Sequence, residues 1–205
     1  MFPLYSILDV SLCAAHGLAP LAVLDAFLRG GAKFVQLRDK TPASGARLTL
    51  ADEVVRRCRA ARAGIVVNDF VDIAKMSGAD GVHLGQEDMA VEDARRILGS
   101  DALIGISTHG EQQIEAAAAG PASYLAVGPI FSTVTKNTGY TARGLHLVRF
   151  GAVTGRPVVA IGGMTVERAP DVIRAGAAAV AVISDLLTGG DPESRTRQYL
   201  AALRV

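Results

Sequence analysis

Five charged residues follow strand-like apolar runs in this sequence and could together hold a highly charged ligand: Arg38, Lys40, Asp69, Asp88 and Lys136. Magnesium prefers a few carboxylate oxygens together with phosphate oxygens and water. Asp69 and Asp88 would each supply one oxygen to Mg²⁺, and the three cations would neutralise the remaining charge of a diphosphate. A salt-bridge network among the same five charges is the alternative, and their spacing favours neither interpretation.

Glycine and serine residues in the C-terminal part of the chain indicate a second phosphate site. Gly162 and Gly163 end one apolar run, and Ser184 ends the next. In barrels of eight strands and helices, the loops after strands seven and eight bind phosphate through backbone N–H groups. Glycine allows a close approach of the ligand, although a pair of tight-turn glycines is the simpler explanation. Because both expected loops carry such residues, the sequence favours phosphate binding.

The histidines carry less information about chemistry. His83 stands between Val82 and Leu84 in an apolar run, so we expect a hydrogen-bonded histidine inside the barrel. His109 follows the next run and either contacts a ligand or caps a helix. The sequence shows no Ser/His/Asp arrangement and no Cys/His metal spacing, so neither covalent catalysis nor a zinc site is expected.

Eight short apolar runs alternate with segments of helical period and must position these residues. The predicted strands are residues 4–10, 34–38, 64–68, 81–85, 103–107, 124–128, 157–162 and 179–184. Helical period occurs between them, as in residues 21–28, 48–58, 91–98, 112–119 and 166–175. This alternation predicts an α/β fold, either a doubly wound sheet or a closed barrel. We expect a single (β/α)₈ TIM barrel over residues 1–205, because the strand count is eight and no dinucleotide fingerprint follows the first strand.

Composition narrows the class of protein. Lysine and arginine total 21 against 20 aspartate and glutamate, a formal net charge of +1 that argues against nucleic-acid and anionic-membrane binding. No run approaches the roughly twenty apolar residues that cross a bilayer. Cys13 and Cys58 lie far apart and fit buried thiols in a reducing compartment. With no basic leader segment apparent, we expect a soluble, cytoplasmic protein.

Seven motifs, taken in order, resemble the signatures of thiamine-phosphate synthases. They are residues 36–40 (QLRDK), 67–69 (VND), 81–89 (GVHLGQEDM), 107–109 (STH), 128–136 (GPIFSTVTK), 160–163 (AIGG) and 181–184 (AVIS). The resemblance covers nearly the whole chain, and the ordered set is far more specific than any one motif. It implies a transferase that joins hydroxymethylpyrimidine diphosphate to thiazole phosphate, with small molecules as its only partners and a homo-oligomer left open.

The resemblance also implies a role for each site residue. The pyrimidine diphosphate would bind with Mg²⁺ through Asp69 and Asp88. Its diphosphate would be surrounded by Gln36, Arg38, Lys40, Asn68, Ser107 and Lys136. Catalysis would rest on the charges and hydroxyl that stabilise the leaving pyrophosphate, which are those of Arg38, Lys40, Ser107 and Lys136. The thiazole phosphate would lie against Thr133, Thr135, Gly163, Ile183 and Ser184.

Two residues depart from the family pattern. Phe70 stands where an arginine is usual, which puts the affinity for the diphosphate in doubt, and Asn137 replaces a common charged residue. A thiazole tautomerase of the same superfamily is the nearest alternative, although such relatives tend to lose the diphosphate-binding set. A non-catalytic regulator that binds thiamine-related ligands is the third interpretation.

Overall fold

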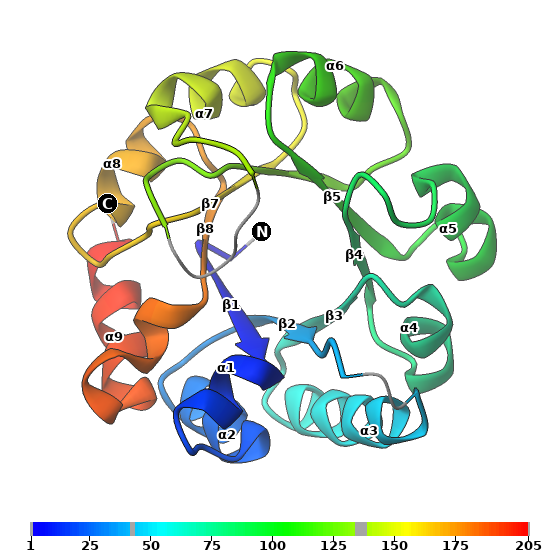
Figure 1. Cartoon of the computed structure of the whole chain (residues 1–205), viewed down its shortest axis with the longest axis vertical. Coiled ribbons are helices and arrows are strands. Elements are labelled where there is room, and N and C mark those ends of the chain that lie inside the picture. The colour runs from blue at the N-terminus through cyan, green and yellow to red at the C-terminus, as the bar shows by residue number, and fades with distance from the viewer. Residues whose placement is uncertain (1, 42–43, 134–138, 205) are drawn as a thin grey trace.

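Eight parallel strands close into a barrel surrounded by helices (Figure 1). The computed structural model describes residues 2–41, 44–133 and 139–204. Each strand pairs with the next one along the chain, and β1 closes the barrel on β8. The strands are β1 Leu4–Asp9, β2 Phe34–Arg38, β3 Gly64–Asn68, β4 Gly81–Leu84, β5 Leu103–Thr108, β6 Tyr124–Val127, β7 Val158–Ile161 and β8 Ala179–Val182.

Helices follow the strands and cover the outside of the barrel. They are α1 Val10–Ala15, α2 Pro20–Arg29, α3 Ser44–Ala60, α4 Val71–Ser77, α5 Val91–Leu98, α6 Glu111–Ala119, α7 Gly144–Ala152, α8 Ala169–Arg174, the 3₁₀ helix η1 Ser184–Gly190 and α9 Pro192–Ala202. N-terminal capping interactions stabilise the first turn of some of these helices. Asp191 accepts a hydrogen bond from the backbone N–H of Ser194 at the start of α9, and Pro192 occupies the first helical position. None of the helices described is long and apolar enough to cross a membrane.

The molecule has two apolar layers because strand residues alternate between the helices and the barrel interior. The larger layer lies between strands and helices, and includes Leu8, Val35 and Ile104. The smaller layer fills the barrel and contains Tyr5, Ile7, Phe34, Val66, Tyr124, Val159, Ala179 and Ala181. Two buried polar residues on strands, Gln36 and His83, add hydrogen-bonding groups among these strands. The barrel interior is therefore packed with side chains.

The predicted barrel is confirmed, with each strand within two residues of its predicted ends. One expected position is wrong. Ser184 does not end the eighth strand: β8 stops at Val182, and Ser184 is the first residue of η1. Ile183 has φ −113° and ψ −89°, which lies outside the extended region and breaks the strand before Ser184.

Candidate functional site

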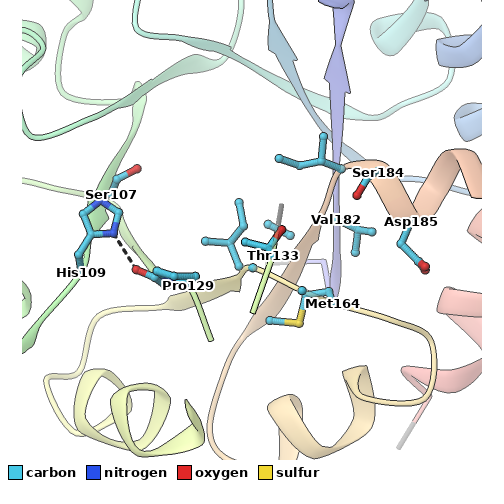
Figure 2. A pocket seen from close by; sticks show the side chains of 14 residues that line it. Ser107, His109, Pro129, Thr133, Met164, Val182, Ser184 and Asp185 are labelled. Atoms are coloured by element: carbon cyan, nitrogen blue, oxygen red, sulfur yellow. Dashed lines mark hydrogen bonds between the residues drawn. The ribbon is translucent and has the colours of Figure 1, made fainter. Parts of the chain in front are cut away.

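A cavity of about 110 Å³ lies at the carboxyl ends of β5 to β8 (Figure 2). Five residues predicted from the sequence line it: Ser107, Thr133, Gly163, Ile183 and Ser184. Figure 2 shows Ser107 across the cavity from Ser184. The structure therefore brings together residues that lie as far as 77 positions apart in the chain (184 − 107). We call this space the β7–β8 cavity.

Backbone forms one wall of the β7–β8 cavity, at Gly162 and Gly163. Both have positive φ, +103° and +61°, a region that glycine adopts without strain. A Cβ atom on Gly163 would lie 2.5 Å from the carbonyl oxygen of Ser132, and one on Gly162 would lie 2.7 Å from Cα of Pro129. Any larger residue would push this wall away from the loop after β6. The positive φ and the tight packing confirm the turn explanation for both glycines, and phosphate binding at this pair stays a prediction.

A negative charge beside the cavity is neutralised by residues of α9. Asp185 lines the cavity, and its Oδ2 accepts hydrogen bonds from Arg195 Nη2 at 2.8 Å and from the hydroxyl of Tyr199 at 2.5 Å. Burial, together with the Asp185 carboxylate, raises the pKa of Tyr199, so its hydroxyl remains a donor. Since Asp185 is paired in this way, it presents little repulsion to a phosphate.

The predicted metal-binding carboxylates lie together on the other side of the rim. Asp69 follows β3 and Asp88 follows β4, and we call them the acidic pair. Asp69 also forms an ion pair with Lys40. Oδ2 of Asp88 accepts a hydrogen bond from the backbone N–H of Gly85 at 2.6 Å. Burial raises the pKa of Asp69, and the neighbouring Asp88 raises it further, while Lys40 opposes both effects.

Asp69 has an unusual backbone conformation, which among the described non-glycine residues it shares with Arg62. Its φ is +65°, in the left-handed region that residues other than glycine rarely adopt. Its N–H donates to the carbonyl oxygen of His83 on the adjacent strand at 2.7 Å, which holds the turn in place. A strained conformation persists only where the surrounding structure holds it, and such residues cluster at functional sites.

The acidic pair suits a divalent cation that completes its shell elsewhere. Within residues 2–41, 44–133 and 139–204, no three His, Cys, Asp or Glu side chains form a metal-binding group. Two carboxylates alone match Mg²⁺, which usually keeps several waters and binds substrate phosphate oxygens. A cation between Asp69 and Asp88 would also relieve the repulsion that raises the pKa of Asp69.

Two of the predicted phosphate-binding cations pair with carboxylates, and only the pair of Lys40 with Asp69 is one that the salt-bridge alternative expected. Arg38 Nη1 donates to Asp9 Oδ2 at 2.5 Å, and Lys40 contacts Asp69. Asp9 was not foreseen, although it ends the first strand and also accepts a hydrogen bond from the N–H of Leu12. The Lys40 side chain is still 45% exposed, which leaves it accessible to a ligand. The two interpretations are therefore compatible.

The remaining predicted residues have separate positions. Gln36 is buried on β2 and donates to the hydroxyl of Tyr5, and Asn68 is buried at the end of β3. Thr135 and Lys136, and with them Asn137, lie outside the described residues. Their placement at the rim stays a prediction.

His83 and His109 both lie at or next to the β7–β8 cavity. His83 is 7% exposed and bonds Tyr124 and Ser107, which confirms the prediction of a hydrogen-bonded histidine in the barrel. His109 lines the β7–β8 cavity, and its Nδ1 lies 2.7 Å from the carbonyl oxygen of Gly128. At the start of α6, the backbone N–H of His109 donates to Oε1 of Gln113 at 2.7 Å. Ligand contact by the His109 side chain stays a prediction.

Phe70 has a structural partner that the sequence did not reveal. The Arg47 guanidinium on α3 lies over the Phe70 ring, 3.7 Å from its centre. Arg47 is 6% exposed and donates to the carbonyl oxygens of Asp39 and Thr41, which flank Lys40. The residue that replaces the usual arginine therefore packs under another arginine and helps to hold the loop that carries Lys40.

Known proteins resemble this chain along most of its length. A family model described as thiamine monophosphate synthase matches residues 4–186. A thiamine-phosphate synthase of Thermosynechococcus vestitus is 44% identical over 184 residues, covering 89% of this chain and 52% of that protein. One from Natronomonas pharaonis is 41% identical over 190 residues, covering 91% of this chain and 89% of that protein. The chain thus spans about half the length of some relatives it matches.

A solved structure shares the same architecture. Thiamine phosphate pyrophosphorylase from Pyrococcus furiosus has a TM-score of 0.89 and 30% sequence identity, over 98% of this chain and 95% of that one. The similarity therefore extends around the whole barrel, including both sides of its rim.

Proposed function

This chain belongs to the thiamine monophosphate synthase family, and from that premise we propose that it joins hydroxymethylpyrimidine diphosphate to thiazole phosphate. The products would be thiamine monophosphate and pyrophosphate. This reaction needs one site for a diphosphate with its metal and a second site for a phosphate, both within reach of the reacting carbon and nitrogen.

One observation carries the proposal: His83 connects two sites of the required kinds. Its carbonyl oxygen accepts from the N–H of Asp69 in the acidic pair, and its imidazole bonds Ser107, which lines the β7–β8 cavity. One residue of β4 therefore touches a turn suited to a metal diphosphate and a side chain of a cavity suited to a phosphate. This proximity supports a reaction between two phosphorylated ligands.

The described residues provide binding and charge stabilisation rather than a nucleophile. Mg²⁺ held by Asp69 and Asp88 would supply positive charge to the diphosphate oxygens. The bond between the pyrimidine methylene carbon and the diphosphate oxygen breaks, and its electron pair leaves with pyrophosphate. Lys40 and Arg38 stabilise that developing charge, and Lys136, which lies outside the described residues, is predicted to do the same. The thiazole nitrogen then donates its lone pair to the methylene carbon, while Gly163 and Ser184 hold its phosphate.

We also propose a cytoplasmic location. Cys13 and Cys58 are both buried, unpaired thiols. Burial raises the pKa of Cys13 to about 11 and that of Cys58 to about 12, so both stay protonated and unreactive. Unpaired thiols are typical of reducing compartments.

A coupled assay for pyrophosphate release tests the function directly. The purified chain is supplied with both substrates and Mg²⁺, and each substrate alone serves as the control. We expect pyrophosphate to be released only when both substrates are present. Its amount should equal the amount of thiamine monophosphate formed. Interconversion of thiazole tautomers without pyrophosphate would favour the tautomerase instead. Binding of both ligands without turnover would favour the regulator.

A further inference from the structure

A chain of buried hydrogen bonds crosses the barrel interior and ends at the β7–β8 cavity. Nε2 of Gln36 donates to the hydroxyl of Tyr5 at 2.8 Å, and that hydroxyl lies 2.9 Å from the hydroxyl of Tyr124. The Tyr124 hydroxyl lies 3.1 Å from Nδ1 of His83, whose Nε2 lies 2.9 Å from Oγ of Ser107. We call these five residues the interior chain. Its members come from β2, β1, β6, β4 and β5.

The packing around the interior chain is specific to it. A Cβ atom on Gly105 would lie 2.1 Å from the Tyr124 ring, so glycine at this position of β5 makes room for the phenol. The Tyr5 ring packs edge-on against Phe34, with 4.8 Å between ring centres. Burial raises the pKa of both tyrosines well above the ordinary value, so each keeps its single hydroxyl hydrogen.

With Gln36 Nε2 as the donor to Tyr5, one direction of donation lets both hydroxyls and both ring nitrogens of His83 form their bonds. Tyr5 receives a hydrogen from Gln36, so its own hydrogen is directed to Tyr124. Tyr124 then directs its hydrogen to Nδ1 of His83, which must accept. A neutral imidazole with an accepting Nδ1 carries its hydrogen on Nε2 and donates it to Ser107.

We propose that His83 is a positioning residue, held by Tyr124 in the Nε2–H form so that the Ser107 hydroxyl directs its hydrogen into the cavity. Ser107 already accepts from His83, and a hydroxyl has only one hydrogen to donate. The group that faces a ligand is then a donor of fixed direction, which suits an anionic phosphate oxygen. This inference deepens the proposed function and rests on it only for the identity of the ligand.

The tautomer of His83 can be measured without any substrate. Long-range ¹H–¹⁵N correlation spectra of ¹⁵N-histidine protein distinguish the two neutral forms, and His83→Gln identifies the His83 signals among four histidines. We expect Nε2–H in the wild type. Hydrogen on Nδ1 would mean that the interior chain runs in the opposite direction, and would overturn the proposal.

Two matched variants each remove one hydroxyl of the interior chain. In Tyr124→Phe, Nδ1 loses its donor, so we expect a mixture of tautomers. In Tyr5→Phe, Tyr124 keeps its hydrogen but loses the hydroxyl that donates to it, so we expect the Nε2–H form to fall less than in Tyr124→Phe. A Tyr124→Phe spectrum that matches the wild type, in a folded protein, would show that Tyr124 does not set the tautomer and would overturn the proposal.

Steady-state kinetics then separate positioning from folding. The resemblance assigns Ser107 to the leaving diphosphate, whose oxygens gain charge in the transition state, so Tyr124→Phe should lower kcat about tenfold with a smaller change in KM. Tyr5→Phe should lower kcat less, by about threefold, since Tyr124 can still donate to Nδ1. Equal losses of kcat in both variants would count against the proposal. If the wild type shows the Nε2–H form but releases no pyrophosphate, the proposed function fails while the interior chain stands.

Discussion

The two sides of the rim at the carboxyl ends of the strands are built from different kinds of group. The acidic pair and Lys40 use charged side chains, and they satisfy one another through an ion pair. The β7–β8 cavity relies on backbone and small residues, with glycines at positive φ at Gly162 and Gly163. Charged side chains can hold a metal diphosphate but repel one another without it. Backbone groups bind phosphate without net charge, and depend on close packing instead.

Each side also has an arginine that lies over an aromatic ring, and the two arginines differ in their burial. Arg47 lies over Phe70 and is buried, while Arg168 lies over Phe131 at 4.7 Å and is exposed. Arg168 donates to the carbonyl oxygen of Gly163 at 2.7 Å, as Arg47 does to that of Asp39. Because one side relies on charged side chains and the other on close-packed backbone, removing a charge should impair ligand binding most on the acidic side. Adding a larger side chain should impair it most on the cavity side.

The largest expected effect comes from removing either carboxylate of the acidic pair. Asp69→Ala and Asp88→Ala should each lower the rate of pyrophosphate release at least about a hundredfold, because the metal loses a ligand beside the leaving group. Raised Mg²⁺ should restore part of the rate in initial-velocity assays. Full activity of both variants in EDTA would end the metal assignment.

Lys136→Ala should have the next largest effect. We expect the synthase rate to fall about a hundredfold, with a tenfold loss as the lower bound. A cation near the leaving pyrophosphate interacts more strongly as the C–O bond breaks, so kcat should fall as well as KM rise. Thiazole phosphate should still bind, as measured by calorimetry, because its site is assigned to Gly163 and Ser184. The exposed Lys75 provides the control in Lys75→Ala, and equal kinetics in the two variants would refute the role.

Bulk on the cavity side should weaken binding of the thiazole phosphate. Gly163→Ala places a Cβ atom 2.5 Å from the carbonyl oxygen of Ser132, and overpacking costs about 1–3 kcal/mol. The KM for thiazole phosphate should therefore rise about tenfold or more. Gly189→Ala is the matched control, since Gly189 also has positive φ but no atom near the added carbon. If both variants change KM equally, backbone strain rather than the wall explains the effect.

The two arginines should differ in their contribution to stability. Arg47→Ala removes a buried stacking contact and leaves carbonyl groups without a donor, a loss of about 2 kcal/mol or more. Tm should then fall by about 4–8 °C, whereas Arg168→Ala should cost about 1 kcal/mol or less. Thermal unfolding of both variants measures the difference.

Phe70→Arg tests the same stacking contact from the other residue. A second guanidinium would lie against Arg47, so we expect a lower Tm and no improvement in the KM for the pyrimidine substrate. A lower KM with unchanged Tm would show instead that the arginine usual in the family still matters here.

The smallest effect concerns stability against pH. The pKa of Asp69 is raised in the folded protein, so its charge opposes folding at neutral pH and this penalty disappears as pH falls below the ordinary range of aspartate. Asp69→Asn should therefore have a higher Tm than the wild type at pH 7 without metal. The difference should shrink towards pH 3, and Mg²⁺ should stabilise only the wild type. A lower Tm at pH 7 would show that the contact with Lys40 outweighs burial.

The sequence by itself determined the strands and the rim at which the predicted site residues gather. Apolar runs and helical period are local patterns, so the strand ends were predicted within two residues. Parallel strands bring their carboxyl ends to one rim, which made the grouping of Asp69 with Asp88 predictable. Ser184 was misplaced because its apolar run continues past the point where the backbone leaves the strand.

Only the tertiary structure decided which side chains touch one another. Tyr5 and Tyr124 lie 119 residues apart, and by pattern each is one more apolar strand residue. Their contact depends on closure of the barrel and on the face that each strand turns inward, which pairing register sets. Phe70 looked like a lost charge until α3 placed Arg47 over its ring. Such contacts join distant segments of the chain. Local periodicity predicts which residues are buried but not which residues they contact, so these pairs could not be predicted from the sequence pattern.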